Sequence, residues 1–341
     1  MEYRRLGRSG LKVSEIALGT MTFGKGADEA EAGRILDAAL DAGVNFIDTA
    51  DTYAEGASEA YLGRLLHGIR HELVLATKFN NPTGAGPNDS GSSRAHIVRA
   101  LEDSLARLRT DYIDLYYIHH VDVQTPLDET LRALDDLVRA GKVRYIAASN
   151  YEAWRLLEAL WQSDSNGWSR FVAYQPQYNL LVRDIEDEIV PVCELKGVGI
   201  VPWGPLAGGL LTGKYQGGTT SIAGSRSEDG WGFRDRQQYY HAQRETVVAT
   251  LIELADELGR RPGAIALRWL LERPAVASVI VGARDAAQLA DNTDAAGWRL
   301  PPEVKVRLDT VSAPPPRYPK AFEARMQERR DAAVKFSVRR G

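Results

Sequence analysis

The chain has 341 residues and a formal net charge of −4, with 44% hydrophobic and 26% charged residues. This balance is ordinary for a globular protein and excludes the basic surface typical of nucleic-acid-binding chains. One cysteine allows no internal disulfide, and no apolar run approaches the roughly 18 residues of a membrane span, so we expect a cytoplasmic protein.

Short apolar runs alternate with longer amphipathic segments along most of the chain. Eight runs are predicted strands, and several are apolar throughout, as parallel strands buried on both faces are. They cover residues 16–18, 44–47, 73–77, 112–118, 143–147, 171–174, 199–202 and 277–281. The alternation predicts an α/β fold, a (β/α)8 TIM barrel. No domain boundary interrupts residues 1–341, and a tail from about residue 313 includes a charged, helix-like stretch over 320–335.

The segments between the strands carry helix start signals. Asp28 with Glu31 three residues later is typical of a capping box, and Thr125 before Pro126 is typical of an N-cap and a first helical residue. Ser58 is predicted to cap a helix over residues 59–66. Residues 81–93 and 214–236 are predicted loops, and a loop as long as the second is usually functional.

Polar or aromatic residues end most of the predicted strands. The carboxyl ends of barrel strands open on one face, where barrel active sites lie, so these residues are expected to converge. They are Asp48, Lys78, His119, Ser149, Asn150, Gln175 and Trp203, and Tyr53 follows on the loop after Asp48.

Four of these residues make chemical sense together. Reducing a carbonyl group requires a proton for the developing alkoxide, and the phenol of Tyr53 is the predicted donor. The reference pKa of tyrosine, about 10, is too high for easy donation at neutral pH, but a neighbouring cation lowers it. Lys78 is the predicted cation, which Asp48 would hold charged, and His119 would hydrogen-bond the substrate oxygen or assist the proton relay. Each residue alone is compatible with a structural role, and their combination favours catalysis.

The segments after the seventh and eighth strands favour a dinucleotide. Trp203 offers a flat face for a nicotinamide ring. Small residues that would let backbone amides approach a pyrophosphate are Gly204, Ala207 and Gly208. Gly282 and Arg284 precede a helix with three polar residues on one face, Gln288, Asp291 and Asn292. The chain shows no Rossmann or P-loop pattern and no spaced zinc ligands, so no metal is expected.

Together these motifs resemble the aldo-keto reductase superfamily over residues 5–292. The resemblance rests on GTMTFG, FIDTADTYAEGASEAYLG, VLATKF, LRTDYIDLYYIHHVD and ASN, while GPLAGGLLTGKY and GARDAAQLADN are most similar to the bacterial branch that includes potassium-channel β-subunits. It implies a catalytic tetrad of Asp48, Tyr53, Lys78 and His119. It also implies contacts to NADPH (NADP+) from Thr20, Met21, Asp48, Ser149, Asn150, Gln175, Trp203, Gly204, Pro205, Leu206, Ala207, Gly208, Lys214, Arg226, Gly282, Arg284, Gln288, Asp291 and Asn292.

The resemblance also implies roles within this set. Ser149, Asn150 and Gln175 would contact the carboxamide, and Arg226 would close over the cofactor. Arg284 stands where many relatives have serine, but a guanidinium keeps the capacity to bind a 2′-phosphate.

The favoured hypothesis is an NADP(H)-dependent oxidoreductase that reduces an aldehyde or ketone to an alcohol, reversibly, with Tyr53 as general acid. One alternative is a cofactor-binding regulatory or sensor subunit on the same fold. Another is a lyase or aldolase that uses Lys78 as a Schiff base, which Asp48 disfavours by keeping the lysine charged. The expected partner is a small-molecule carbonyl substrate, with no nucleic acid and no membrane, and the oligomeric state is left open.

Overall fold

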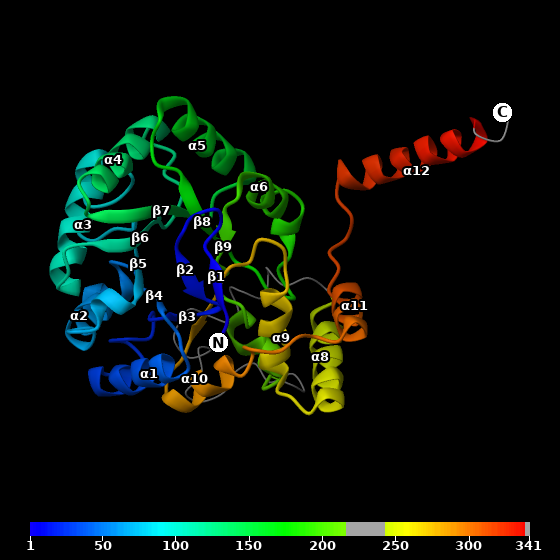
Figure 1. Cartoon of the computed structure of the whole chain (residues 1–341), viewed down its shortest axis with the longest axis horizontal. Helices are drawn as coiled ribbons and strands as arrows, with labels where there is room; N and C mark the ends of the chain where they lie inside the picture. The colour runs from blue at the N-terminus through cyan, green and yellow to red at the C-terminus, as the bar shows by residue number, and fades with distance from the viewer. Residues whose placement is uncertain (216–242, 338–341) are drawn as a thin grey trace.

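The computed structural model describes residues 1–215 and 243–337, with side chains up to residue 332. Eight parallel strands form one curled sheet in the order β10-β3-β4-β5-β6-β7-β8-β9 (Figure 1). They are β3 (Ile16–Gly19), β4 (Phe46–Asp48), β5 (Val74–Phe79), β6 (Ile113–Ile118), β7 (Val143–Ser149), β8 (Phe171–Gln175), β9 (Gly199–Ile200) and β10 (Val279–Gly282). Each strand overlaps one of the eight predicted runs, and the predicted (β/α)8 barrel is confirmed.

Backbone hydrogen bonds join the two ends of this sheet. Ile200 in β9 donates its N–H to the carbonyl oxygen of Ala275 at 2.8 Å and accepts from the N–H of Ala277 at 2.9 Å. The N–H of Ile280 in β10 donates to the carbonyl oxygen of Pro202 at 3.1 Å. The strands at the two ends of the order are thereby linked, so the sheet closes into a barrel.

Helices cover the outside of the sheet (Figure 1). In the described part of the chain they are α1 (Glu29–Asp41), α2 (Ala57–Leu65), α3 (Arg94–Leu108), α4 (Leu127–Arg139), α5 (Ala153–Asn166), α6 (Ile189–Lys196), α8 (Arg244–Leu258), α9 (Pro262–Leu271), α10 (Ala286–Thr293), α11 (Pro302–Val311) and α12 (Lys320–Ser337). Short 3-10 segments are η1 (Tyr53–Gly56), η2 (Arg70–Glu72), η3 (Asp184–Glu186) and η4 (Ala207–Thr212). Helix α12 extends away from the barrel (Figure 1). Among the helices of the described residues, none has the length and apolar character needed to cross a membrane.

The start of α1 was predicted correctly and the start of α2 was not. Asp28 caps α1 by accepting a hydrogen bond from the N–H of Glu31 at 2.8 Å. Ser58 does not cap α2, because the helix begins at Ala57 and its N-cap is Gly56. The buried Ser58 hydroxyl lies 2.8 Å from that of Thr20 instead, so it fastens α2 to the loop after β3.

The predicted cap of α4 is also wrong. The helix begins one residue later than expected, so Pro126 is the N-cap. The hydroxyl of Thr125 donates to Asp122 Oδ2 at 2.7 Å, within the loop that precedes the helix. A local side-chain acceptor has therefore taken the hydroxyl that the sequence pattern assigned to the helix.

The buried apolar residues form two layers. One layer lies between the sheet and the helices and includes Ile47, Leu75 and Phe79. The other fills the inside of the barrel and consists of Leu6, Val13, Ala17, Phe46, Val74, Ala76, Leu115, Tyr117, Ala147, Ala173, Val201, Ala277 and Ile280. Along each strand the residues alternate between these layers, as side chains on a strand must.

An unpredicted N-terminal hairpin covers the base of the barrel. Strand β1 (Tyr3–Arg5) pairs antiparallel with β2 (Lys12–Ser14), and the fully buried Leu6 and Val13 belong to the inner layer. At Gly7, with φ +57°, a Cβ atom would lie 2.5 Å from a backbone oxygen of the segment before β9. Only glycine fits so close an approach in this conformation.

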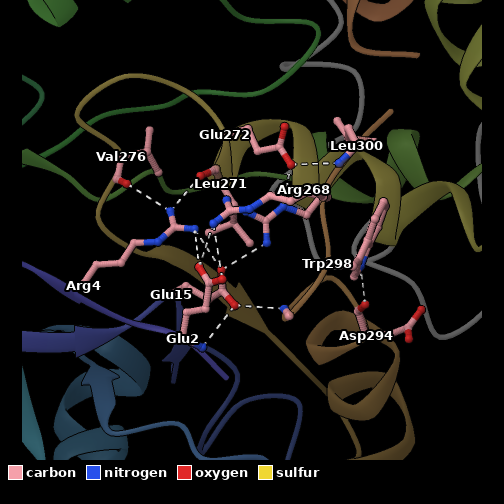
Figure 2. A network of polar contacts seen from close by, with 12 residues as sticks. Glu2, Arg4, Glu15, Arg268, Leu271, Glu272, Val276, Asp294, Trp298 and Leu300 are labelled. Carbon is pink, nitrogen blue, oxygen red and sulfur yellow. Dashed lines mark hydrogen bonds and ion pairs between the residues drawn. The ribbon is translucent and has the colours of Figure 1, made fainter. Parts of the chain in front are cut away.

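A buried ionic network joins this hairpin to the last third of the chain (Figure 2). The fully buried Glu15 carboxylate contacts Arg4 Nη2 at 2.9 Å and Arg268 Nη1 at 3.1 Å through Oε2. Its Oε1 accepts from the N–H groups of Glu2 at 3.2 Å and Gly297 at 3.1 Å. Because both oxygens have several donors, the buried charge is compensated.

Candidate active site

The candidate site residues follow directly from the alternation of the strands. Side chains two residues apart on a strand share a face, so the residue two positions after an inward-facing one also points into the barrel. This relation joins Phe46 to Asp48, Ala76 to Lys78, Tyr117 to His119, Ala147 to Ser149, Ala173 to Gln175 and Val201 to Trp203. The apolar filling of the barrel thus ends in a polar layer at the carboxyl ends of six consecutive strands.

Lys78 lies at the centre of this layer and is fully buried. Its Nζ donates to Asp48 Oδ1 at 2.5 Å, to the carbonyl oxygen of Thr49 at 2.7 Å and to the hydroxyl of Tyr53 at 3.3 Å. The three donor hydrogens of a lysine ammonium therefore each have an acceptor. Gln175 Nε2 donates to the other Asp48 oxygen at 2.9 Å and holds the carboxylate in place.

Lys78 stays protonated although it is buried. Burial alone lowers the pKa of Lys78, but the Asp48 carboxylate and Tyr53 outweigh it and hold this pKa above its ordinary value. A charged lysine cannot attack a carbonyl carbon, since the neutral amine is the nucleophile. This electrostatic environment favours a proton-transfer site over a Schiff-base site.

A tight turn with left-handed backbone angles places Tyr53 next to Lys78. Ala54 and Glu55 have φ values of 49° and 56°, and Gly56 follows with 89°. Non-glycine residues in this region are uncommon and are often found at functional sites. The turn also brings the Tyr53 ring edge-on to His119, with ring centroids 6.0 Å apart.

His119 is neutral in this environment. Burial lowers the pKa of His119 to about 2, with further contributions from Lys78 and His120, whose ring stacks on it at 4.7 Å. A neutral imidazole carries one N–H and can donate one hydrogen bond. Its Nδ1 lies 3.2 Å from Asn81 Nδ2, a contact that sequence reasoning missed.

The polar residues after β7 form a chain toward Trp203. Ser149 Oγ donates to the carbonyl oxygen of Gln175 at 2.7 Å. Asn150, with a positive φ of 59°, donates through Nδ2 to the carbonyl oxygen of His119 at 3.0 Å and accepts from Trp203 Nε1 at 3.1 Å. These bonds fix the Trp203 ring beside the polar layer, as the sequence predicted.

The segment after β9 makes a succession of tight turns. Gly204, Ala207, Gly208 and Gly209 all have positive φ values, between 51° and 99°. The N–H groups of Ala207 and Gly209 donate within these turns to the carbonyl oxygens of Gly204 and Leu206. Pro205 is buried beside them, and the exposed Lys214 lies against Gly209.

The face of α10 carries its predicted residues, and each of them has a partner within the protein. Gln288 Oε1 accepts from the N–H of Arg284 at 2.9 Å, and Asn292 Nδ2 donates to the carbonyl oxygen of Gly282 at 3.4 Å. Asp291 forms an ion pair with Arg261. The loop after β10 is therefore fastened to α10, with Arg284 beside the helix N-terminus.

Three further residues were predicted to contact the cofactor, and the structure describes two of them. Thr20 is fully buried, and its hydroxyl bonds to the carbonyl oxygen of Asp48 at 3.1 Å. Met21 lies in the turn after β3 and is partly buried. Arg226 lies outside the described residues.

A buried acid next to the site was not anticipated. Asp51 is 3% exposed, and within the described residues neither of its carboxylate oxygens has a hydrogen-bond partner. Burial and the nearby Glu59 raise the pKa of Asp51 to about 7, against opposing contributions from Arg107 and Lys78. Its backbone N–H donates to the carbonyl oxygen of Lys78 at 3.1 Å, which places it directly behind the Tyr53 turn.

This geometry agrees with comparisons to known proteins. The sequence profile of the Aldo/keto reductase family matches residues 15–313. The chain belongs to this family. A Bacillus subtilis protein named as an uncharacterized oxidoreductase, YrpG, is 40% identical over 322 residues, covering 91% of this chain and 96% of the relative. Aldo-keto reductase AMT2 of Alternaria alternata is 36% identical, covering 92% of each chain.

A relative with a different name matches almost as well. An Arabidopsis thaliana protein named as a voltage-gated potassium channel subunit beta is 36% identical, covering 94% of this chain and 100% of the relative. The predicted likeness to both oxidoreductases and channel β-subunits is thus confirmed. The chain is an oxidoreductase of the aldo/keto reductase family.

Proposed function

We propose that this aldo/keto reductase reduces an aldehyde or ketone to an alcohol with NADPH, reversibly, and that Tyr53 is its general acid. The observation that carries the proposal is the position of Lys78, whose Nζ is shared by Asp48 at 2.5 Å and Tyr53 at 3.3 Å. A cation beside a phenol favours loss of the phenolic proton. Tyr53 is the only one of these three groups with a neutral, donatable proton at the mouth of the barrel.

His119 completes the proton-donating side of the proposed site. Because this imidazole stays neutral at physiological pH, it is not the acid. It serves as a fixed hydrogen-bond donor to the substrate oxygen while Tyr53 delivers the proton. A preorganised donor aimed at developing negative charge contributes about 10²–10³-fold to catalysis in well-studied enzymes.

The other half of the polar layer fits a nicotinamide cofactor. The Trp203 ring, held by Asn150, offers a stacking surface, and Ser149 and Gln175 place polar groups beside it. The cofactor supplies the hydride when bound. The turns of η4 and the N-terminus of α10 would bind its phosphates, because barrel proteins bind phosphate after the seventh and eighth strands. Arg284 beside that helix supports a preference for NADPH.

We also infer a cytoplasmic protein that forms one domain. The only cysteine, Cys193, is fully buried, and burial raises the pKa of its thiol to about 12, so the thiol is unreactive. A chain without exposed or paired cysteines suits a reducing compartment.

Replacing Tyr53 with phenylalanine tests the function. Tyr53→Phe removes only the hydroxyl, so turnover of a panel of aldehydes with NADPH should fall at least about 10²-fold. Cofactor affinity, followed by tryptophan fluorescence, should stay within about twofold, because most of the proposed cofactor contacts lie after other strands. Tyr61→Phe, in α2, is the matched control and should behave as wild type. Near-normal turnover by Tyr53→Phe would contradict the proposal, and no turnover by the wild type with any aldehyde would favour a regulatory subunit.

A further inference from the structure

The two nitrogens of the His119 ring face different surroundings. The ring is neutral, so one nitrogen carries the proton and the other accepts hydrogen bonds. The proposed function needs a donor toward the substrate oxygen. Which nitrogen holds the proton therefore decides whether His119 can act.

Asn81 makes the polar contact that discriminates between the two forms. Its amide nitrogen Nδ2 lies 3.2 Å from His119 Nδ1. An amide nitrogen carries only hydrogens, so Nδ2 donates and Nδ1 must accept. The remaining proton is then on Nε2, on the opposite side of the ring from Asn81.

The backbone that presents Asn81 is strained and held in place. The preceding residue, Asn80, has a φ of 112°, which is rare for a residue with a side chain. Its Nδ2 donates to Ser92 Oγ at 3.0 Å, and its carbonyl oxygen accepts from the N–H of Gly91 at 2.8 Å. Strain of this kind persists only where surrounding contacts enforce it, and it clusters at functional sites.

The partner ring is equally constrained. The backbone N–H of His119 donates to the carbonyl oxygen of Phe79 at 2.9 Å, so the end of β6 is tied to the end of β5 just before Asn81. One ring face stacks on His120, with an interplanar angle of 3°. These contacts therefore hold the backbone around both Asn81 and His119 in position.

We propose that Asn81 is a positioning residue that holds neutral His119 in the Nε2–H form, so that the ring presents a hydrogen-bond donor to the substrate oxygen. Asn81 itself does not touch the substrate. The catalytic consequence rests on the proposed reductase function, whereas the position of the proton on the ring can be measured without turnover.

The direct test is nitrogen NMR of the protein labelled with 15N-histidine. The chain has six histidines, and the His119 signals are assigned by their loss in His119→Asn. The wild type should show a protonated Nε2 and an unprotonated Nδ1 for His119. The reverse pattern would overturn the proposal, whatever the enzyme activity.

Asn81→Asp then reverses the hydrogen-bond direction. A carboxylate only accepts, so it should draw the His119 proton to Nδ1 and remove the donor at Nε2. We expect kcat to fall by about 10²-fold while KM for NADPH changes less than about twofold. Asn88→Asp adds the same charge to the same loop and is the matched control. Asn81→Ala, which imposes neither form, should lie between the wild type and Asn81→Asp, and it serves if the aspartate variant does not fold.

A pH profile separates this role from simple damage to the loop. The new carboxylate raises the pKa of His119, against the opposing influence of Lys78 and His120, while Tyr53 faces the ring edge. Once doubly protonated, the ring again has a donor at Nε2, so kcat of Asn81→Asp should recover as pH falls, relative to the wild type at each pH. The positioning role would be refuted if kcat of Asn81→Asp fell while the His119 proton stayed on Nε2, or if kcat did not recover as the pH fell. An inactive wild type with the expected NMR pattern would refute the proposed function alone.

Discussion

Replacing the buried acid Asp51 with asparagine should make the protein less sensitive to alkaline pH. In the native state the pKa of Asp51 is raised from 3.8 to about 7, mainly by burial. The folded protein therefore holds this proton more tightly than the unfolded chain does. Below about pH 4 both states are protonated and Asp51 has no pH-dependent effect, whereas from about pH 4 toward pH 7 the unfolded chain loses this proton and the folded protein keeps it, so stability falls as pH rises.

The size of this cost follows from the shift. About three pKa units, at about 1.4 kcal/mol each, amount to about 4 kcal/mol at full effect. Between about pH 5 and about pH 8 the cost grows by about 2.5 kcal/mol, since part of it is already present at the lower pH. Asp51→Asn cannot ionise, so its stability relative to wild type should rise by this amount over the same interval. Any loss of local contacts in the variant is independent of pH and cancels in the difference.

Urea unfolding followed by tryptophan fluorescence measures this difference at the two pH values. Replacement of Asp41 by asparagine serves as a matched control, because it removes a carboxylate of the same kind at an exposed position. If Asp51→Asn changed the free energy of unfolding by the same amount at both pH values, Asp51 would have the same pKa in the folded and unfolded protein. The reasoning from burial would then be wrong.

Two further predictions concern the cofactor and the lysine. Arg284→Ala should weaken NADPH binding about tenfold or more and leave NADH almost unchanged, because charge-assisted hydrogen bonds to a 2′-phosphate contribute about 1.5–3 kcal/mol each; equal losses for both cofactors, measured by fluorescence titration, would mean that Arg284 only supports its loop. Lys78→Met should leave a folded protein that binds cofactor but reduces carbonyls at least about 10²-fold more slowly, because Asp48 then stands unpaired near Tyr53. Measuring turnover and melting temperature on one sample decides between roles, since preserved turnover with a lowered melting temperature would make the Lys78–Asp48 pair purely structural.

The regular part of the site could be predicted because the barrel repeats one rule. A strand that alternates between two buried layers fixes the direction of its last side chain, so Asp48, Lys78 and His119 could be placed together from their positions after apolar runs. The rule does not reach Thr20, which follows the end of β3 and whose hydroxyl bonds to the carbonyl oxygen of Asp48, so its predicted contact with the cofactor stays a prediction.

The parts that sequence reasoning missed depend on irregular backbone. Asn81 lies in a segment rich in Gly, Pro, Asn and Ser, where the direction of a side chain depends on the φ of Asn80 and not on any periodicity. The N-terminal hairpin has strands of three residues, too short for an alternating pattern to be distinguished from chance. Thr125 and Ser58 had the expected cap chemistry, but the Thr125 hydroxyl bonds to the nearby Asp122 and the Ser58 hydroxyl to Thr20, 38 positions away.

The network around Glu15 has a consequence for how the chain is made. Glu15 and its partner Arg268 are separated by 253 positions, and β3 must pair with β10, which is synthesised later still. While the ribosome is translating the middle of the message, the Glu15 carboxylate in the emerging amino-terminal part has Arg4 but not Arg268 as a partner, and the edge of β3 is unpaired. Such edges and long-range contacts slow folding and invite aggregation. The final third of translation therefore supplies both missing partners, and a messenger truncated before codon 268 yields a product that lacks the second of the two arginines that contact Glu15.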